Sequence, residues 1–142
     1  MPLNSGDLLD DKYQLLHTLG RGGFGEVWLA RDTVLGDHHV AIKFLTSASP
    51  EKDKTFLVEM RALAGLNLPG IVTFYHHFRH QKQLALVMEY CEHGSLAQRL
   101  RAEQLTDAQA WVNQVMKWVL ELCDTLTTVH ARGLVHHIGN RR

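Results

Sequence analysis

The chain has 142 residues, of which 45% are hydrophobic and 21% are charged, and its formal net charge at pH 7 is zero. This composition is typical of one globular domain, and a chain without a basic excess is not expected to bind nucleic acid or an anionic membrane surface. No apolar run approaches a membrane span and the first residues lack signal-peptide features, so we expect a cytoplasmic protein with no membrane partner.

Residues 1–10 are expected to form a loose leader, and a glycine-rich segment follows them. Its spacing, G-x-G-x-x-G over residues 20–25, removes Cβ atoms where backbone N–H groups would come closest to a triphosphate. The same spacing also joins a strand to a helix in dinucleotide-binding folds, so the glycines alone do not decide between the two kinds of site. The candidate nucleotide-binding residues of this segment are Leu19, Gly20, Arg21, Gly22, Gly23, Phe24, Gly25, Glu26 and Val27.

The residues after the glycines favour a β-hairpin over a helix. Residues 26–30 and 40–44 both alternate in side-chain character, and residues 35–37 provide a turn between them. Alternation places Ala41 and Lys43 on the face of the second strand that looks toward the glycines. A small residue beside a lysine suits a flat ring over Ala41 and phosphates at Lys43. The other face of this strand carries Val40, Ile42 and Phe44.

A helix is predicted next, with Ser49 as its N-cap and Pro50 as its first residue. Glu59 lies on the face of this helix that is otherwise apolar. A carboxylate among core positions is costly unless a cation meets it, and Lys43 is the obvious candidate. The alternative is a surface glutamate whose carboxylate reaches water. The apolar positions at helical spacing are Phe56, Met60 and Leu63.

These motifs, in this order, resemble the protein kinase family, specifically its serine/threonine kinases of bacterial type. The resemblance runs from about Tyr13 to His136, which is nearly the whole chain. It implies that residues 20–27 are the glycine-rich loop over ATP. It also implies that Lys43 holds the α- and β-phosphates, and that Glu59 is the ion-pair partner of Lys43 on helix C.

The resemblance extends to residues 84–91, which are similar to the fifth strand of a kinase small lobe as it runs into the hinge. It implies that Met88 is the gatekeeper residue. It further implies that the backbones of Glu89 and Cys91 bond the edge of the adenine ring. Residues 94–96 would then open the short helix that follows the hinge.

A long helix is predicted over residues 107–132. Thr106 and Gln109 fit a capping box at its start, and Gly133 stands where a C-terminal cap glycine belongs. Its apolar residues leave little polar face, so we expect the helix to be buried on several sides, as is its counterpart in the kinase large lobe. Without that cover we expect self-association or chaperone binding. The apolar residues are Trp111, Val112, Val115, Met116, Trp118, Val119, Leu120, Leu122, Cys123 and Leu126.

The last ten residues depart from the family pattern H-R-D-x-K-P-x-x-N. Only His136 agrees with it, Ile138 stands where the catalytic aspartate is expected, and no aspartate follows Asp124. Asn140 comes too early to be the metal-binding asparagine, and no D-F-G segment is present. Mg²⁺ is expected for the family, but its ligands are missing, so no metal residue is assigned. A frameshift or an early stop would explain the departure.

The ten histidines raise the alternative of a structural metal site. His38 and His39 fall near a hairpin turn, whereas residues 76–80 place their histidines along a strand and its turn. No two of these residues form the i, i+4 pair on a helix that zinc sites often use. The spacing therefore disfavours zinc.

Together these observations predict an α+β fold: a kinase-like small lobe with a five-stranded antiparallel sheet and helix C, followed by the first helices of an incomplete large lobe. The expected units are a leader (1–10), the small lobe (11–88), the hinge (89–95) and a truncated large lobe (96–142). The implied family activity is transfer of the ATP γ-phosphoryl group to serine or threonine of a protein substrate. We expect this chain to bind ATP but to be catalytically incompetent. The alternative is a non-catalytic, pseudokinase-like module for nucleotide binding or protein interaction.

Overall fold

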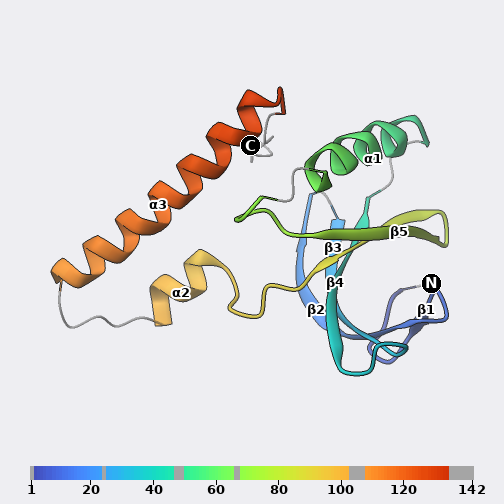
Figure 1. Cartoon of the computed structure of the whole chain (residues 1–142). Coiled ribbons are helices and arrows are strands. Elements are labelled where there is room, and N and C mark those ends of the chain that lie inside the picture. The colour runs from blue at the N-terminus through green and yellow to red at the C-terminus, as the bar shows by residue number, and fades with distance from the viewer. Residues whose placement is uncertain (1, 24, 47–49, 66–67, 103–107, 135–142) are drawn as a thin grey trace.

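The computed structural model of the chain describes residues 2–23, 25–46, 50–65, 68–102 and 108–134. Figure 1 shows a curled antiparallel sheet with one helix beside it, and two further helices that lie to the other side in this view. In chain order the elements are β1 (Leu8–Leu9), β2 (Tyr13–Gly22), β3 (Gly25–Asp32), β4 (His38–Leu45), α1 (Pro50–Ala64), β5 (Phe74–His80), β6 (Gln83–Glu89), α2 (Leu96–Ala102) and α3 (Ala108–Ala131).

The sheet has six strands in the order β1-β2-β3-β4-β6-β5, and every neighbouring pair is antiparallel. This is one strand more than the sequence analysis predicted. The additional strand is β1, in which Leu8 pairs with Gln14 and Leu9 with Tyr13. The Leu9 side chain is buried, so the end of the expected leader belongs to the sheet. Two residues are too few to show an alternating pattern in the sequence.

The predicted hairpin over residues 26–44 is confirmed as β3 and β4, and a buried carboxylate holds its turn. Asp32 Oδ1 accepts the backbone N–H groups of Val34 and Leu35 at 2.9 and 3.0 Å, and Lys12 Nζ lies 3.0 Å from Asp32 Oδ2. Burial of Asp32 disfavours its charged form, but the bonds from Leu35, Lys12 and Val34 outweigh burial and lower its pKa. Gly36 completes the turn with a φ of 81°.

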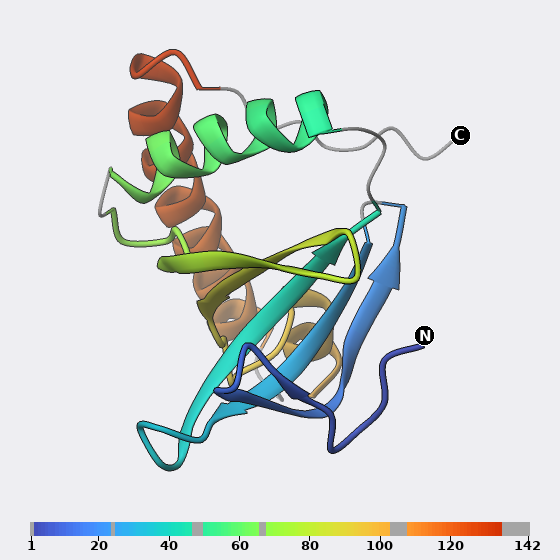
Figure 2. The same cartoon turned by 90° about the vertical axis from the view of Figure 1, so that its right-hand side faces the viewer.

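The two faces of the sheet are buried against different partners. One face packs on itself inside the curl of the sheet, and the other face receives α1. The residues inside the curl are Leu9, Tyr13, Leu15, Trp28, Ala30, Val40, Ile42, Phe44, Ala85 and Val87. The residues that meet beneath α1 are Leu45, Leu84 and Leu86 of the sheet, Phe56, Leu57 and Met60 of α1, and Phe74 and Met88. Figures 1 and 2 show α1 beside β5.

Helix α3 confirms the long helix predicted for residues 107–132. Its C-terminal end has the predicted glycine: Gly133 has a φ of 73°, its N–H donates to the His130 carbonyl, and the Leu134 N–H donates to the Val129 carbonyl. The predicted N-cap, Thr106, lies outside the described residues. Within the described part of the chain, no helix combines the length and apolarity needed to cross a bilayer.

The segment between α1 and β5 touches α3. The Thr125 hydroxyl lies 3.2 Å from the Pro69 carbonyl oxygen and 2.9 Å from the Glu121 carbonyl oxygen of its own helix. Gly70 has a φ of 87°, and an added Cβ would lie 2.7 Å from Thr125 Oγ1. This contact joins the sheet half of the chain to its helical half, and the absence of a side chain at Gly70 permits it.

Candidate nucleotide-binding site

Strand register brings four of the predicted nucleotide-binding residues onto one face of the sheet. Val27 lies opposite Lys43 across the β3–β4 pair, and Ala41 lies opposite Met88 across the β4–β6 pair. Directly opposite residues project to the same side, and so do residues two apart in one strand, such as Ala41 and Lys43. The four side chains therefore belong to one surface, which we call the nucleotide face.

Lys43 is half-buried on the nucleotide face, where β3 contributes Val27 and β6 contributes Leu86 as its opposite residues. Burial lowers the pKa of the Lys43 ammonium group, because apolar surroundings disfavour the charged form. A cation with reduced hydration gains more from a nearby anion than a fully solvated one does. The position suits a charge-assisted contact with a phosphate group.

The glycine-rich segment is the β2–β3 hairpin, in which Gly22 lies opposite Gly25. At Gly20 and Gly22 an added Cβ would meet nothing within 4 Å, so the backbone is open there. Gly25 differs, because its φ is 130° and an added Cβ would lie 1.9 Å from the Phe44 carbonyl oxygen. The spacing predicted that all three glycines serve the approach of phosphates, and the structure adds a second requirement at Gly25, the close approach of β3 to β4.

Arg21 and Glu26 bind each other across this hairpin. Arg21 Nε donates to Glu26 Oε1 at 2.9 Å, and one terminal guanidinium nitrogen lies 2.8 Å from the same oxygen. Glu26 alternates with Val27 along β3 and lies opposite Phe44, so the pair sits on the side of the sheet away from the nucleotide face. A nucleotide on that face would meet Arg21 and Glu26 through their backbones only.

Three other residues predicted in this segment complete it. A register shift between Thr18 and Gly20 leaves Leu19 without a directly opposite residue in β3, and the Leu19 side chain is 41% exposed. Gly23 lies in the turn, where an added Cβ would also meet open space. Phe24 lies outside the described residues.

The predicted hinge begins where β6 ends, and Glu89 is fixed there by Thr73. The Glu89 N–H donates to the Thr73 carbonyl at 2.8 Å, and the Thr73 N–H donates to Glu89 Oε2 at 2.9 Å. The bonds from Thr73 lower the pKa of Glu89. The exposed Cys91 follows, and its carbonyl oxygen accepts the Gly94 N–H at 3.3 Å. Sequence reasoning missed the Thr73–Glu89 pair, because the two residues belong to different segments.

The start of α2 contains a capping box that the sequence analysis did not identify. Ser95 Oγ accepts the Gln98 N–H at 3.3 Å, and Gln98 Oε1 accepts the Ser95 N–H at 2.7 Å. The spacing S-x-x-Q was the signal that could have revealed it. Gly94 precedes the box with a φ of 73°. These bonds fix how the chain leaves the hinge.

Glu59, the predicted partner of Lys43, lies within α1, but its side chain is outside the described part of the structure. The Lys43–Glu59 ion pair therefore stays a prediction. His136 and the other residues of the predicted catalytic loop are also outside the described residues. Among the residues that the structure describes, no group of three or more His, Cys, Asp or Glu side chains could hold a metal ion.

Two pockets in the described part of the chain lie away from the nucleotide face. One of about 340 Å³ is formed by residues 68–73 with Ala64 and Glu89, beside the end of α1. The other, of about 230 Å³, is formed around the Arg21–Glu26 pair on the far side of the hairpin. Neither pocket includes a half-buried cation, whereas the nucleotide face contains Lys43.

Comparison with known proteins agrees with this geometry. Residues 13–137 match the family described as "Protein kinase domain". The chain is 32% identical over 127 residues to serine/threonine-protein kinase Nek1 of Mus musculus, covering 89% of this chain and 10% of that protein. It is 29% identical over 134 residues to the probable serine/threonine-protein kinase PknB of Lactococcus lactis, covering 92% and 21%.

A solved structure supports the fold. The chain is similar to a mutant form of the kinase domain of Mycobacterium tuberculosis PknI, with a TM-score of 0.73 and 26% sequence identity. The match covers 96% of this chain and 55% of that one, so the chain spans about half of a solved kinase domain. The predicted α+β class, a kinase-like small lobe with the first helices of a large lobe, is confirmed.

Proposed function

This chain belongs to the protein kinase family, and we propose that it forms the ATP-binding portion of a serine/threonine protein kinase. The observation that carries the proposal is the nucleotide face, on which a half-buried lysine lies beside a small, buried alanine. Gly20 and Gly22, whose backbone is open to an approaching ligand, lie in the same sheet. These are the groups that a flat base with a phosphate chain requires.

In the proposed complex, the adenine ring lies over Ala41 with Val27 and Met88 around it. The backbones of Glu89 and Cys91 would bond the edge of the ring. The phosphate chain extends toward the open backbone of the glycine-rich hairpin. There Lys43 would contact the α- and β-phosphates, and Glu59 of α1 would hold Lys43 in place.

The family reaction transfers the γ-phosphoryl group of ATP to serine or threonine of a protein, with Mg²⁺ on the phosphates. Both relatives are named serine/threonine-protein kinases, which supports a protein substrate, and a cytoplasmic location is part of the same proposal. The 142 residues contain no aspartate after Asp124, so the acidic groups that orient the hydroxyl and bind Mg²⁺ are missing from them. We therefore propose that these residues bind ATP weakly, with little response to Mg²⁺, and do not transfer phosphate by themselves.

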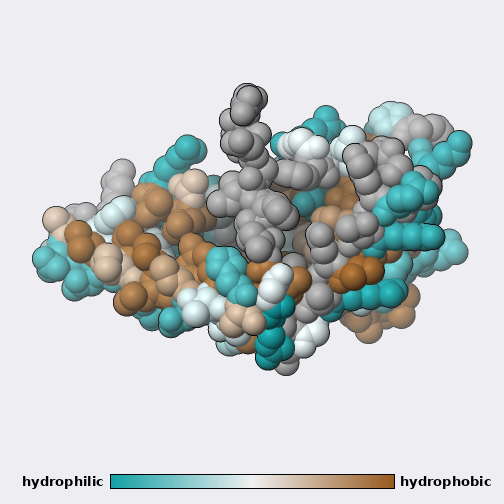
Figure 3. All heavy atoms as spheres, turned by 90° about the horizontal axis from the view of Figure 1, so that it is seen from above, coloured by the Kyte–Doolittle hydropathy of each residue, from teal (hydrophilic) through white to brown (hydrophobic). Residues whose placement is uncertain are grey.

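A second candidate is a non-catalytic interaction module, and the surface of α3 favours it. The described part of α3 exposes several large apolar side chains, and hydrophobic atoms gather at the left of the molecule in Figure 3. Such a surface is typical of a protein–protein contact or of self-association. The exposed apolar residues are Val112, Met116, Val119, Leu120 and Leu122. The encoding DNA discriminates between the two candidates, because an aspartate, an asparagine and D-F-G in the downstream sequence favour the kinase.

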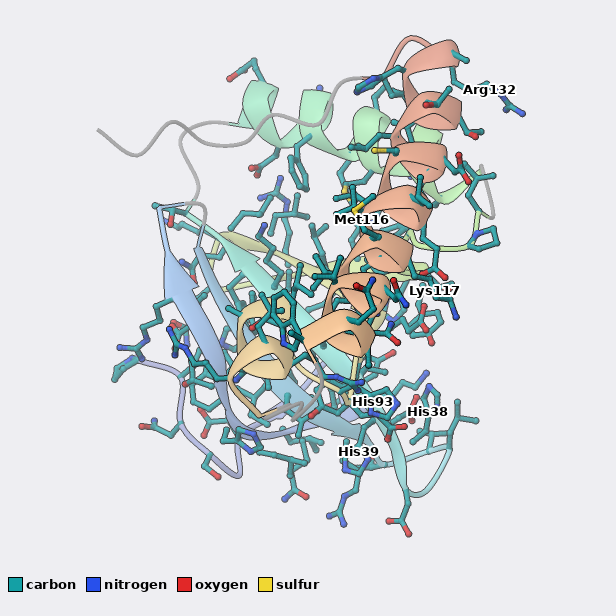
Figure 4. All side chains as sticks on the ribbon, turned by 90° about the vertical axis from the view of Figure 1, so that its left-hand side faces the viewer. His38, His39, His93, Met116, Lys117 and Arg132 are labelled. Atoms are coloured by element: carbon teal, nitrogen blue, oxygen red, sulfur yellow. The ribbon has the colours of Figure 1, made fainter. Side chains whose placement is uncertain are left out.

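Calorimetric titration with ATP, with and without Mg²⁺, tests nucleotide binding. We expect measurable affinity that changes little on adding Mg²⁺ and that falls in Lys43→Ala, where one charge-assisted phosphate contact is lost. Lys117→Ala is the matched control, since Lys117 is an exposed lysine of α3 (Figure 4). Unchanged affinity in Lys43→Ala would place the nucleotide elsewhere, and strong tightening by Mg²⁺ would reveal metal ligands that the sequence reading missed.

A further inference from the structure

Helix α1 is tied to the sheet by a nearly buried carboxylate. Asp53, in the first turn of α1, is 4% exposed, and its Oδ2 lies 2.9 Å from a terminal guanidinium nitrogen of Arg79 in β5. The other terminal nitrogen of Arg79 lies 3.4 Å from the Lys82 carbonyl oxygen in the β5–β6 turn. We call the Asp53–Arg79 contact the clamp.

The clamp differs from the ion pairs within the sheet. Lys12–Asp32 joins neighbouring parts of the β-sheet region, and Arg21–Glu26 closes a hairpin, whereas the clamp joins a helix to a strand that follows it in the chain. The Asp53 side chain is 5% exposed and that of Arg79 is 51% exposed. Loss of Arg79 would therefore leave a poorly hydrated carboxylate without this partner.

The apolar contacts of α1 that the structure describes leave its position less defined than the clamp does. Phe56, Leu57 and Met60 pack on leucines of the sheet, and apolar packing is non-directional. An ion pair with hydrogen-bond geometry fixes one point of the helix relative to β5. Asp53 and Glu59 are six residues apart, or about 9 Å along the helix axis. A fixed Asp53 therefore limits how far residue 59 can shift along the helix axis.

We propose that the Asp53–Arg79 clamp is a positioning contact that holds α1 where Glu59 can meet Lys43, and that it thereby sets the affinity for the phosphates of the nucleotide. This inference rests on the proposed function, because it needs ATP on the nucleotide face. In the proposed complex, neither clamp residue touches the nucleotide. The effect passes through α1 to Lys43, and it changes the binding affinity only of ligands that carry phosphates.

The test compares ATP with adenosine, which has the same base and no phosphate. In Arg79→Gln and in Asp53→Asn we expect ATP affinity to fall about tenfold, the effect of one weakened charge-assisted contact, while adenosine affinity stays unchanged. The reversed pair Asp53→Arg with Arg79→Asp should recover part of the ATP affinity. Lys54→Gln is the matched control, since it removes an exposed charge from the same helix and should bind both ligands like the wild type.

A double variant tests whether the effect passes through Lys43. If it does, adding Arg79→Gln to Lys43→Ala causes no further loss of ATP affinity, whereas an independent effect would add to it. If Arg79→Gln fails to fold, Asp53→Asn keeps the test valid, because that variant removes the buried charge and does not leave it without its partner. Circular dichroism checks that both variants are folded.

The outcomes separate this inference from the proposed function. A wild-type chain that binds neither ATP nor adenosine overturns both. A wild-type chain that binds ATP, together with clamp variants that bind it equally well or lose ATP and adenosine alike, overturns the clamp alone. Loss of ATP affinity that adds fully to that of Lys43→Ala also overturns the clamp.

Discussion

The substitution Gly25→Ala tests whether a glycine at position 25 is required for the close approach of β3 to β4. The added Cβ would lie 1.9 Å from the Phe44 carbonyl oxygen and 2.9 Å from the Phe44 carbonyl carbon, at a φ of 130°. Side-chain Cβ atoms essentially never come within 3.0 Å of such atoms, so the two strands must separate by about 1 Å. The close pairing of Gly25 with Leu45 would then be lost.

The size of the effect follows from these losses. A non-glycine residue in a backbone region that is almost restricted to glycine costs about 1–3 kcal/mol. Opening the end of the β3–β4 ladder forfeits one or two hydrogen bonds at about 1 kcal/mol each. The free energy of unfolding should therefore fall by about 3 kcal/mol, a large part of the roughly 5–15 kcal/mol typical of a domain. For a chain of this size, that corresponds to a drop of about 10 °C in the melting temperature.

Urea denaturation and a thermal melt measure this loss, with Gly20→Ala and Gly22→Ala as matched controls. The control positions open onto space, so the controls should keep their stability within about 1 kcal/mol while losing affinity for ATP. A Gly25→Ala variant as stable as the wild type would refute the steric reasoning. Equal destabilisation by all three substitutions would show that the hairpin, and not the contact with Phe44, limits stability.

Three further predictions concern other parts of the molecule. Folding lowers the pKa of Asp32 below its ordinary value of 3.8. The stability that Asp32 contributes is therefore present above pH 3.8 and is lost as the pH falls through the folded-state pKa. Asp32→Asn should flatten the acid side of the stability–pH curve, whereas Asp37→Asn at the exposed turn should not. Met116→Lys and Leu120→Lys should reduce self-association in sedimentation velocity, and a wild-type monomer at all concentrations would contradict this. Transfer of labelled phosphate to a basic protein by the 142-residue chain should be absent, and activity that disappears in Lys43→Ala would point to an unrecognised base.

Local patterns in the sequence predicted the elements that depend on short-range order. The hairpin over residues 26–44, the helix that begins at Pro50 and the cap at Gly133 were each predicted from periodicity or from one special residue. The division of β4 into two faces was predicted by the same alternation, since Val40, Ile42 and Phe44 lie inside the curl of the sheet. Such features need information from only a few neighbouring residues.

Two contacts between distant segments were not predicted from the sequence. Thr73 and Glu89, and likewise Asp53 and Arg79, are joined only after the sheet order β4-β6-β5 is established. β1 was missed because its pairing with β2, and not its own composition, makes it a strand. The sequence also did not predict which side chains of α3 are half-buried and which are exposed. Trp111 and Trp118 are half-buried, whereas Met116 and Lys117 project from different sides of the helix in Figure 4.

The glycine-rich motif shows why a site cannot be read from spacing alone. Gly20, Gly22 and Gly25 belong to one pattern, yet two of them face open space and the third faces a carbonyl group of the next strand. The third glycine brings β3 close to β4, and β4 carries Lys43. The motif thus has two tasks: it leaves the backbone free for phosphates, and it positions the strand whose half-buried lysine is suited to an anion. Both tasks concern β4, the strand that carries Lys43. Gly25→Ala should therefore lower the free energy of unfolding, and Lys43→Ala should lower ATP affinity, through two different features of the same site.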